Sequence, residues 1–147
     1  MGQTKAKSER GGNVAVVEKF MPRCRIFLLD GKKFRTNLLV LFFDLPLKRE
    51  TATKTALLAE VLKKQDWKNA AEQAEELYGA LWDVSIVKKG DRQLLLFSLE
   101  TLKTVATEDA IAFLRSRIWD RDFDEGTVRR QKEILKRKLE SIADDKK

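Results

Sequence analysis

The stretch "LWDVSIVKKGDRQLLLFSLE", residues 81–100, decides the fold because it predicts a complete β-hairpin. Val84 and Ile86 alternate with polar residues in its first half, and Leu94 and Leu96 mark its second half, as in strands with one buried face. The intervening "KKGD", residues 88–91, is typical of a hairpin turn and too short for a phosphate-binding loop.

A second hairpin is predicted upstream. The apolar run "CRIFLLD", residues 24–30, is followed by an Asp30-Gly31 turn and then by "FRTNLLVLFFDLPL", residues 34–47. Two apolar runs that flank a DG turn are a strong hairpin signal. The six consecutive apolar residues 38–43 further predict a strand covered on both faces.

Four helices are predicted around these hairpins. The first begins at a cap on Thr51 or Thr53 and continues to about Gln65, and it includes the amphipathic stretch "TALLAEVLKKQDW", residues 55–67. The others cover residues 69–80, ending at Gly79, residues 107–119, with Thr107 as cap, and residues 124–145.

This arrangement predicts an α+β fold, in which an antiparallel sheet built from two hairpins carries helices packed on one face. Residues 1–13 read as a flexible basic leader that ends near Gly11 and Gly12. Residues 14–147 read as a single domain, because 147 residues are enough to bury one core.

The composition excludes several kinds of chemistry. The chain has no histidine and one cysteine, Cys24, so it offers no Ser-His-Asp triad, no Cys-His dyad and no imidazole-bound zinc. No apolar run approaches the ~18 residues of a membrane span, so a membrane partner is not expected. The polar, basic start lacks the apolar segment of a secretory signal, which together with the lone cysteine predicts a cytoplasmic protein.

The last predicted helix is strongly basic, in a chain whose formal net charge is +7. Six cations fall within ten residues: Arg129, Arg130, Lys132, Lys136, Arg137 and Lys138. A nucleic-acid-binding helix has this composition, and that function is the alternative interpretation. We favour a solvated face instead, because no aromatic residue lies among the cations to stack on bases. The helix also has a predicted core stripe: Val128, Leu135, Leu139 and Ile142.

Three longer stretches carry a resemblance to a known family: "KKFRTNLLVLFFDLPLKRETATKTALLAEVL", "EELYGALWDVSIVKKGDRQLLLFSLE" and "FDEGTVRRQKEILKRKLESIADDKK". The order and the amino-acid sequences of these stretches resemble a half-domain of the pitrilysin/insulinase-type (inverzincin) zinc peptidases. The chain is most similar to the non-catalytic, peptidase-like branch of that family, over about residues 32–147. The resemblance also implies that a full half-domain is longer, so the chain corresponds to a truncated half.

The resemblance identifies where a zinc site would be. In catalytic members an H-x-x-E-H motif binds zinc through its histidines, and its glutamate activates water. Laid on this chain, the motif falls on Ala56, Ala59 and Glu60, and the third metal ligand falls near Lys138. One carboxylate beside an ammonium group cannot hold a catalytic zinc. The resemblance therefore implies a non-catalytic homologue without catalytic residues, metal or cofactor.

The resemblance also implies a binding surface and partners. In this family a peptide adds as a strand to a sheet edge, which here corresponds to Gly79, Ala80, Leu81, Trp82, Asp83 and Val84. The expected function is a peptide-binding or partner subunit in peptide or protein processing. A truncated sheet leaves an open edge and apolar surface, so the expected partner is a second copy of the chain or a catalytic peptidase-like subunit.

Overall fold

A computed structural model of the chain describes residues 4–7, 15–21, 24–30, 33–65, 72, 75, 77–119 and 122–144. They belong to two compact units, Met1–Arg35 and Thr36–Lys147. In the first unit, β1 (Thr4–Lys7), β2 (Ala15–Met21) and β3 (Cys24–Asp30) form a three-stranded antiparallel sheet in that order. β1 lies within residues 1–13, and the division into a leader and one domain stays a prediction.

The second unit contains a separate antiparallel sheet of three strands. β4 (Thr36–Pro46) pairs with β6 (Arg92–Leu102), and β6 pairs with β5 (Leu81–Lys89), so β4 and β5 are the two edges. Gly90 and Asp91 alone connect β5 to β6, and Gly90 has a φ of +59°, which glycine adopts without steric cost. The hairpin predicted for residues 81–100 is confirmed.

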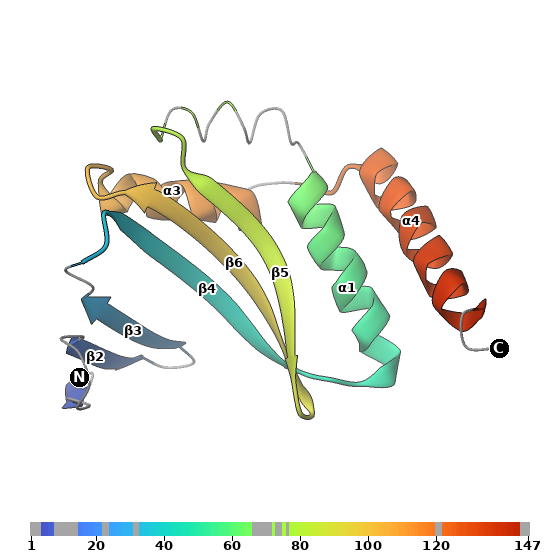
Figure 1. The fold of residues 1–147 in the computed structure, drawn as a ribbon, viewed down its shortest axis with the longest axis horizontal. Helices are drawn as coiled ribbons and strands as arrows, with labels where there is room; N and C mark the ends of the chain where they lie inside the picture. The colour runs from blue at the N-terminus through green and yellow to red at the C-terminus, as the bar shows by residue number, and fades with distance from the viewer. Residues whose placement is uncertain are drawn as a thin grey trace. The chain divides into compact units, whose positions relative to one another are not determined.

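The helices of the second unit are α1 (Arg49–Lys64), α3 (Thr107–Ile118) and α4 (Glu125–Asp144). α3 lies behind the sheet in Figure 1, α1 lies beside β5, and α4 packs on α1. The predicted α+β class, with helices on one face of an antiparallel sheet, is confirmed. Of the helix predicted at residues 69–80, only Glu72, Glu75 and residues 77–80 are described, and the two glutamates are helical.

The hydrophobic core lies between the sheet and the helices. The central strand β6 contributes Leu95, Phe97 and Leu99, whose exposed fractions are 5%, 1% and 0%. Ala59 of α1 and Phe113 of α3 pack against this row from the helical side. Because alternate residues of a strand face opposite sides, β6 buries one row of side chains and turns the other away from the helices.

The hairpin predicted for residues 24–47 is wrong. β3 pairs with β2 and not with β4, and β4 pairs along all eleven of its residues with β6. The register of Met21 opposite Cys24 leaves two residues between β2 and β3, which is the shortest favourable hairpin connection. β4 instead gains the long apolar row of β6 as its neighbour, so the sheet is built from one hairpin and one long-range pairing.

The prediction that residues 38–43 are covered on both faces is also wrong for the described part of the chain. Leu39 and Leu41 pack towards the core, whereas Leu38, Val40 and Phe42 are exposed. The cause is the position of β4 as an edge strand in an antiparallel sheet whose helices occupy one side.

Two predicted caps are wrong as well. α1 begins at Arg49, so Thr51 and Thr53 lie inside it, and its N-cap residue is Lys48, which makes no side-chain capping bond. The N-cap residue of α3 is Ala106, one residue before the predicted Thr107.

The predicted core stripe of the last helix is only partly buried. Val128 and Leu135 are half-buried near α1, but Leu139 and Ile142 are exposed at 49% and 55%. The physical reason is that α4 packs on α1 through its first half, and Figure 1 shows its second half diverging from α1, so these two residues are left uncovered. Gln131, and not an aliphatic residue, is the buried position of α4.

Candidate functional site

The four positions on which the resemblance places a metal motif lie around one pocket. This pocket, of about 310 Å³, is lined by α1, β5 and α4. Ala56, Ala59 and Glu60 line it from α1, because positions four apart on a helix lie on one face. Lys138 lines it from α4. Residues separated by some eighty positions in sequence therefore share a single cavity.

The side chains that complete the pocket are largely apolar. β5 contributes Val84 and Ile86 to its wall, and α4 contributes Ile134 and Leu135. The remaining polar contribution comes from Lys63, Ser85 and the buried Gln131. The pocket can therefore accommodate apolar side chains, and a few polar groups are also part of its lining.

The charges at the pocket do not fit a catalytic zinc ion. Glu60 supplies one carboxylate, while Lys138 and Lys63 supply ammonium groups and Ala56 supplies a methyl group. Lys63 is paired with Asp83 of β5, with 2.5 Å between Nζ and Oδ1, so that carboxylate is engaged. Within the described ranges, no three His, Cys, Asp or Glu residues are grouped as metal ligands would be. No metal-dependent step can be derived from these residues.

The main chain of β5 is open along the side away from β6. In a two-residue hairpin loop the flanking pair, here Lys89 and Arg92, is a hydrogen-bonded pair. Hydrogen-bonded and non-hydrogen-bonded pairs then alternate along the ladder. The residues of β5 that direct their N–H and C=O groups away from β6 are therefore Trp82, Val84, Ile86 and Lys88. Two of these, Val84 and Ile86, border the pocket.

The turn before β5 fixes where this edge begins. Tyr78 and Gly79 have φ angles of 56° and 77°, so two consecutive residues adopt the left-handed region. Tyrosine seldom adopts this conformation, which costs of the order of 1 kcal/mol or more. Ala80 is buried directly after the turn, and Leu81 begins the strand. The predicted segment Gly79–Val84 thus consists of the end of a tight turn and the first half of an edge strand.

The side chain of Trp82 belongs to the core. Its ring lies 6.3 Å from that of Phe97, stacked, and 6.4 Å from that of Phe113, edge-on. Val84 is likewise buried. A peptide at this edge would therefore contact the main chain of these two residues and not their side chains.

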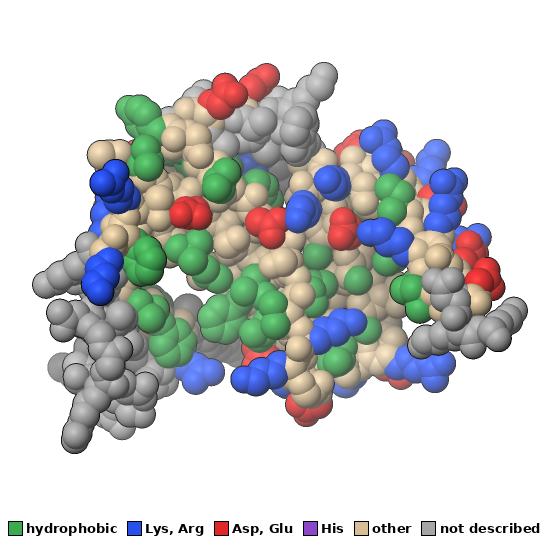
Figure 2. Space-filling model, viewed as in Figure 1, with side chains coloured by type: hydrophobic (Ala, Val, Ile, Leu, Met, Phe, Trp, Pro, Cys, Tyr) green, Lys and Arg blue, Asp and Glu red, His purple; other side chains and the backbone are tan. Residues whose placement is uncertain are grey.

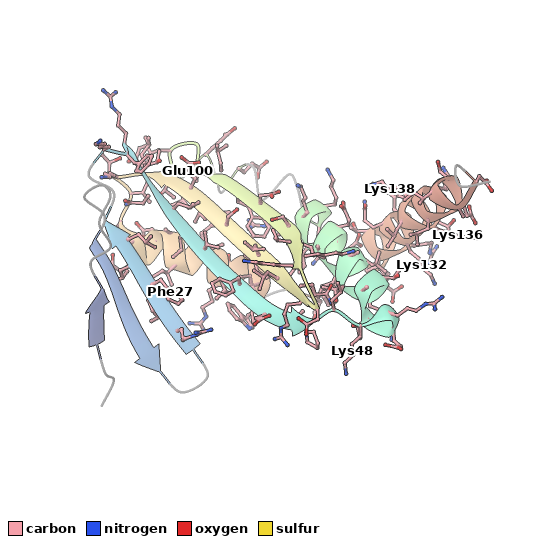
Figure 3. All side chains as sticks on the ribbon, turned by 60° about the horizontal axis from the view of Figure 1, so that its bottom comes forward. Phe27, Lys48, Glu100, Lys132, Lys136 and Lys138 are labelled. Atoms are coloured by element: carbon pink, nitrogen blue, oxygen red, sulfur yellow. The ribbon has the colours of Figure 1, made fainter. Side chains whose placement is uncertain are left out.

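The basic face of α4 is a separate feature of the same unit. All six predicted cations of this helix are exposed, and Figure 3 labels Lys132, Lys136 and Lys138 along it. Lys136 pairs with Glu140 at 4.0 Å, which is a weak surface contact. This exposure is what both interpretations of the helix require.

The comparisons with known proteins agree with a metallopeptidase-like chain. No family model matches. Over 95% of its length the chain is 29% identical to a protein of Bacillus subtilis (strain 168) named probable inactive metalloprotease YmfF, and the match covers 34% of that protein. The name of this relative supports the interpretation of the chain as an inactive metallopeptidase homologue.

A solved structure is similar as well. A conserved protein from Enterococcus faecalis V583 matches 83% of the chain with a TM-score of 0.73 and 28% sequence identity. The match covers 32% of that protein. The chain therefore spans about a third of the length of each of these two proteins.

Sequence reasoning missed two parts of the site. It did not identify Lys63, Gln131 or the apolar wall from α4, because the packing of α4 against α1 carries no local signal. It also did not predict which main-chain groups of β5 are open, although the two-residue turn at Gly90 and Asp91 determines that register.

Among the described residues, no helix is both long and apolar enough to cross a bilayer.

Proposed function

We propose that the chain is a non-catalytic homologue of the insulinase-type peptidases that binds an extended peptide along β5. One observation carries the proposal: the open main-chain edge of β5 borders the pocket that contains all four positions of the lost metal motif. In such an arrangement a bound peptide would pair with the strand and pass over the former metal site. The absence of the motif leaves binding without cleavage.

The pocket and the edge suit strand addition. Main-chain hydrogen bonds give affinity in this mode of recognition, and pockets for alternate side chains give specificity. Val84 and Ile86 would offer the hydrogen-bonding groups, and the apolar wall formed by Ile134 and Leu135 would receive a peptide side chain. The similarity to a probable inactive metalloprotease supports the same conclusion.

The peptide-binding part is tested by proline substitution at the edge. A pooled library of labelled eight-residue peptides serves as the probe, with fluorescence anisotropy as the measurement. Val84→Pro removes an N–H that points to the open side, so we expect binding to fall at least ~10-fold, which corresponds to about 1.4 kcal/mol. Ile86→Pro repeats the test at a half-buried side chain, which tolerates the change better than the buried Val84 does.

The matched control is Val40→Pro in β4. Arg92 of β6 directs its main-chain N–H and C=O groups to β5. Pro46, which lies opposite Arg92 on β4, therefore has its main chain directed away from β6, where a proline is tolerated because no N–H is needed. Val40 also directs its main-chain groups away from β6, so its substitution by proline removes an outward N–H on the opposite edge of the sheet. The proposal would be contradicted if folded Val40→Pro and Ile86→Pro lost peptide binding equally. It would also be contradicted if neither β5 variant changed peptide binding.

The former metal site is tested by restoring its ligands. Ala56→His, Glu60→His and Lys138→Glu together supply two imidazoles and a carboxylate at the pocket, the ligand set of several catalytic zinc sites. We expect one zinc ion per chain to remain after dialysis, as measured by elemental analysis. The control carries the two histidines and keeps Lys138, and it should retain much less zinc. A folded triple variant without zinc would contradict the assignment of these positions.

A second candidate function, nucleic-acid binding, is favoured by the exposure of six cations on α4. It predicts an affinity for duplex DNA whose logarithm falls with the logarithm of salt concentration with a slope near −0.9 per phosphate contact. Neutralising Arg129, Arg130 and Arg137 should abolish it. Binding unaffected by this triple change would exclude α4 as the interface. A cytoplasmic location and a catalytic partner subunit remain parts of the first proposal.

A further inference from the structure

The side of the sheet opposite the helices carries an uncovered apolar surface, which we call the outer face. It consists of the outward residues of β4, β6 and β5. Its apolar members include Leu38, Val40 and Phe42 of β4, Leu94 and Leu96 of β6, and Val87 of β5. Figure 2 views the unit from this side, and hydrophobic side chains gather over the strands there. A contiguous apolar surface on a sheet commonly marks an interface.

The outer face carries charges on all three strands: Glu100 and Arg92 of β6 near its two ends, Asp44 of β4, and Asp83 and Lys89 of β5. Asp44 pairs with Arg92, and Asp83 pairs with Lys63. Glu100 of β6 lies between Leu38 and Leu81 of the neighbouring strands and is half-buried. No described side chain forms an ion pair with it. Arg92 lies at the opposite end of the same strand, where its Nε donates to Asp44 Oδ1 at 2.8 Å. Figure 3 labels Glu100 near the end of the sheet away from the β5–β6 turn.

The two charged residues of β6, Glu100 and Arg92, are placed symmetrically about Leu96. Glu100 is four residues after Leu96 on β6, and Arg92 is four residues before it, so all three side chains point to the outer face. A two-fold axis that crosses β6 at Leu96, in the plane of the interface and perpendicular to the strands, would place a second copy face to face with the first. It would bring Glu100 of each copy opposite Arg92 of the other and Leu96 and Phe42 opposite their own counterparts.

We propose that the outer face binds a second copy of this chain, with the strands of the two copies running in opposite directions. Two sheets packed face to face lie ~10 Å apart, a separation that apolar side chains fill and that two long charged side chains can span. The charges select this orientation: if the strands ran in the same direction, Glu100 would face Glu100 and Arg92 would face Arg92. The interface is isologous, as in most soluble dimers.

Dimerisation through the outer face leaves the peptide site accessible. The open edge of β5 and the pocket lie on the helical side and flank of the sheet, next to α1 and α4. The two proposals are therefore independent, and loss of the dimer should leave peptide binding unchanged.

The test is charge reversal, read out by sedimentation equilibrium over a range of protein concentrations. Glu100→Lys places two cations at each end of the interface and should weaken the dimer at least ~10-fold. Arg92→Glu should weaken the dimer similarly, because the new carboxylate of each copy would face Glu100 of the other copy. The double variant restores opposite charges across the two-fold axis and should regain at least ~10-fold in affinity over either single variant. Glu133→Lys, which makes the same charge change on exposed α4, is the control and should leave the dimer unchanged.

Three results would overturn the proposal. The first is an unmodified chain that stays monomeric at every concentration reached. The second is a dimer that Glu100→Lys does not weaken. The third is a double variant that recovers no affinity while remaining folded by circular dichroism, because the antiparallel register requires that recovery.

Discussion

The two faces of the sheet β4-β6-β5 are built from the same strands and have different surroundings. On the helical side, β6 presents Leu95, Phe97 and Leu99, which the helices and the neighbouring strands bury almost completely. On the outer face, Leu38 of β4 remains 66% exposed. Both faces are rich in apolar side chains, so composition does not distinguish them.

The difference teaches that one face stabilises the unit and the other is available for association. Burial contributes ~25 cal/mol per Å² of apolar surface removed from water. The inner row receives this contribution within a single chain, whereas the outer row receives it only when another surface covers it. Mutations on the two faces should therefore act on different equilibria, folding for the inner face and association for the outer face.

The largest expected effect comes from removing the central inner side chain. Phe97→Ala deletes a ring that is 1% exposed and contacts the rings of Phe43 and Trp82. We expect the free energy of unfolding to fall by ~3–5 kcal/mol, as for other buried phenylalanines. Urea denaturation at a protein concentration low enough to keep the chain monomeric measures this change.

Phe42→Ala makes the same substitution on the outer face and is the control. It should lower the free energy of unfolding of the monomer by about 1 kcal/mol or less, since Phe42 is 43% exposed. If both substitutions cost the monomer equally, the distinction between the faces is incorrect.

How much of this arrangement could be predicted depended on how local each signal is. The hairpin of β5 and β6 was predictable because its turn and its alternating residues lie within twenty positions. The partner of β4 was not, because β4 pairs with β6 more than fifty residues away at the start of the strand. Leu38–Phe43 is apolar without alternation, so no pattern indicated that one of its faces is exposed.

Prediction of the candidate site likewise succeeded only where the signal is local in the sequence. Positions 56, 59 and 60 could be placed on one helical face from spacing, whereas Lys138 was assigned by resemblance alone. That these four positions share a pocket depends on how α4 packs on α1, which sequence periodicity does not report. The exposed end of α4 shows the limit of such patterns. Its apolar stripe predicted burial for Leu139 and Ile142, but this part of α4 diverges from α1 and is not covered by it.

A smaller effect is expected at the polar end of the inner face. The buried Gln93 donates through Nε2 to Pro46 O at 3.2 Å and to Thr55 Oγ1 at 3.3 Å. Thr55→Val removes one of these acceptors and leaves Nε2 less satisfied, so we expect a loss of ~1–2 kcal/mol in the free energy of unfolding.

Thr53→Val is the matched control for this prediction. Thr53 lies on the exposed side of the same helix, so the change should stay within ~0.5 kcal/mol. An unchanged stability in Thr55→Val, measured by urea denaturation, would show that the inner face depends on its apolar row alone.

The smallest effect concerns α4, which covers the inner face only indirectly through α1. Asp124 precedes this helix and accepts a hydrogen bond from the Thr127 N–H at 2.7 Å. The hydrogen bonds from the Thr127 side chain and main chain hold the pKa of the Asp124 carboxyl below its usual value. A lowered pKa in the folded state means that the ionised carboxylate stabilises the helix start fully above the unfolded pKa of ~3.9 and loses this effect as the pH falls through the folded pKa.

We therefore expect the first turn of α4 to fray as the pH is lowered below about 4, while the inner core around Phe97 remains protected. The Thr127 amide should then exchange with solvent more readily relative to the Leu99 amide, as NMR hydrogen exchange measures. Asp124→Asn keeps a capping side chain without a titrating group, so the ratio of the two exchange rates, which cancels the intrinsic pH dependence of exchange, should not change over the same range. The same pH dependence in Asp124→Asn would mean that another carboxyl controls the helix start. Loss of protection at Leu99 together with Thr127 would mean that α4 is as important to the inner face as α1 and α3 are.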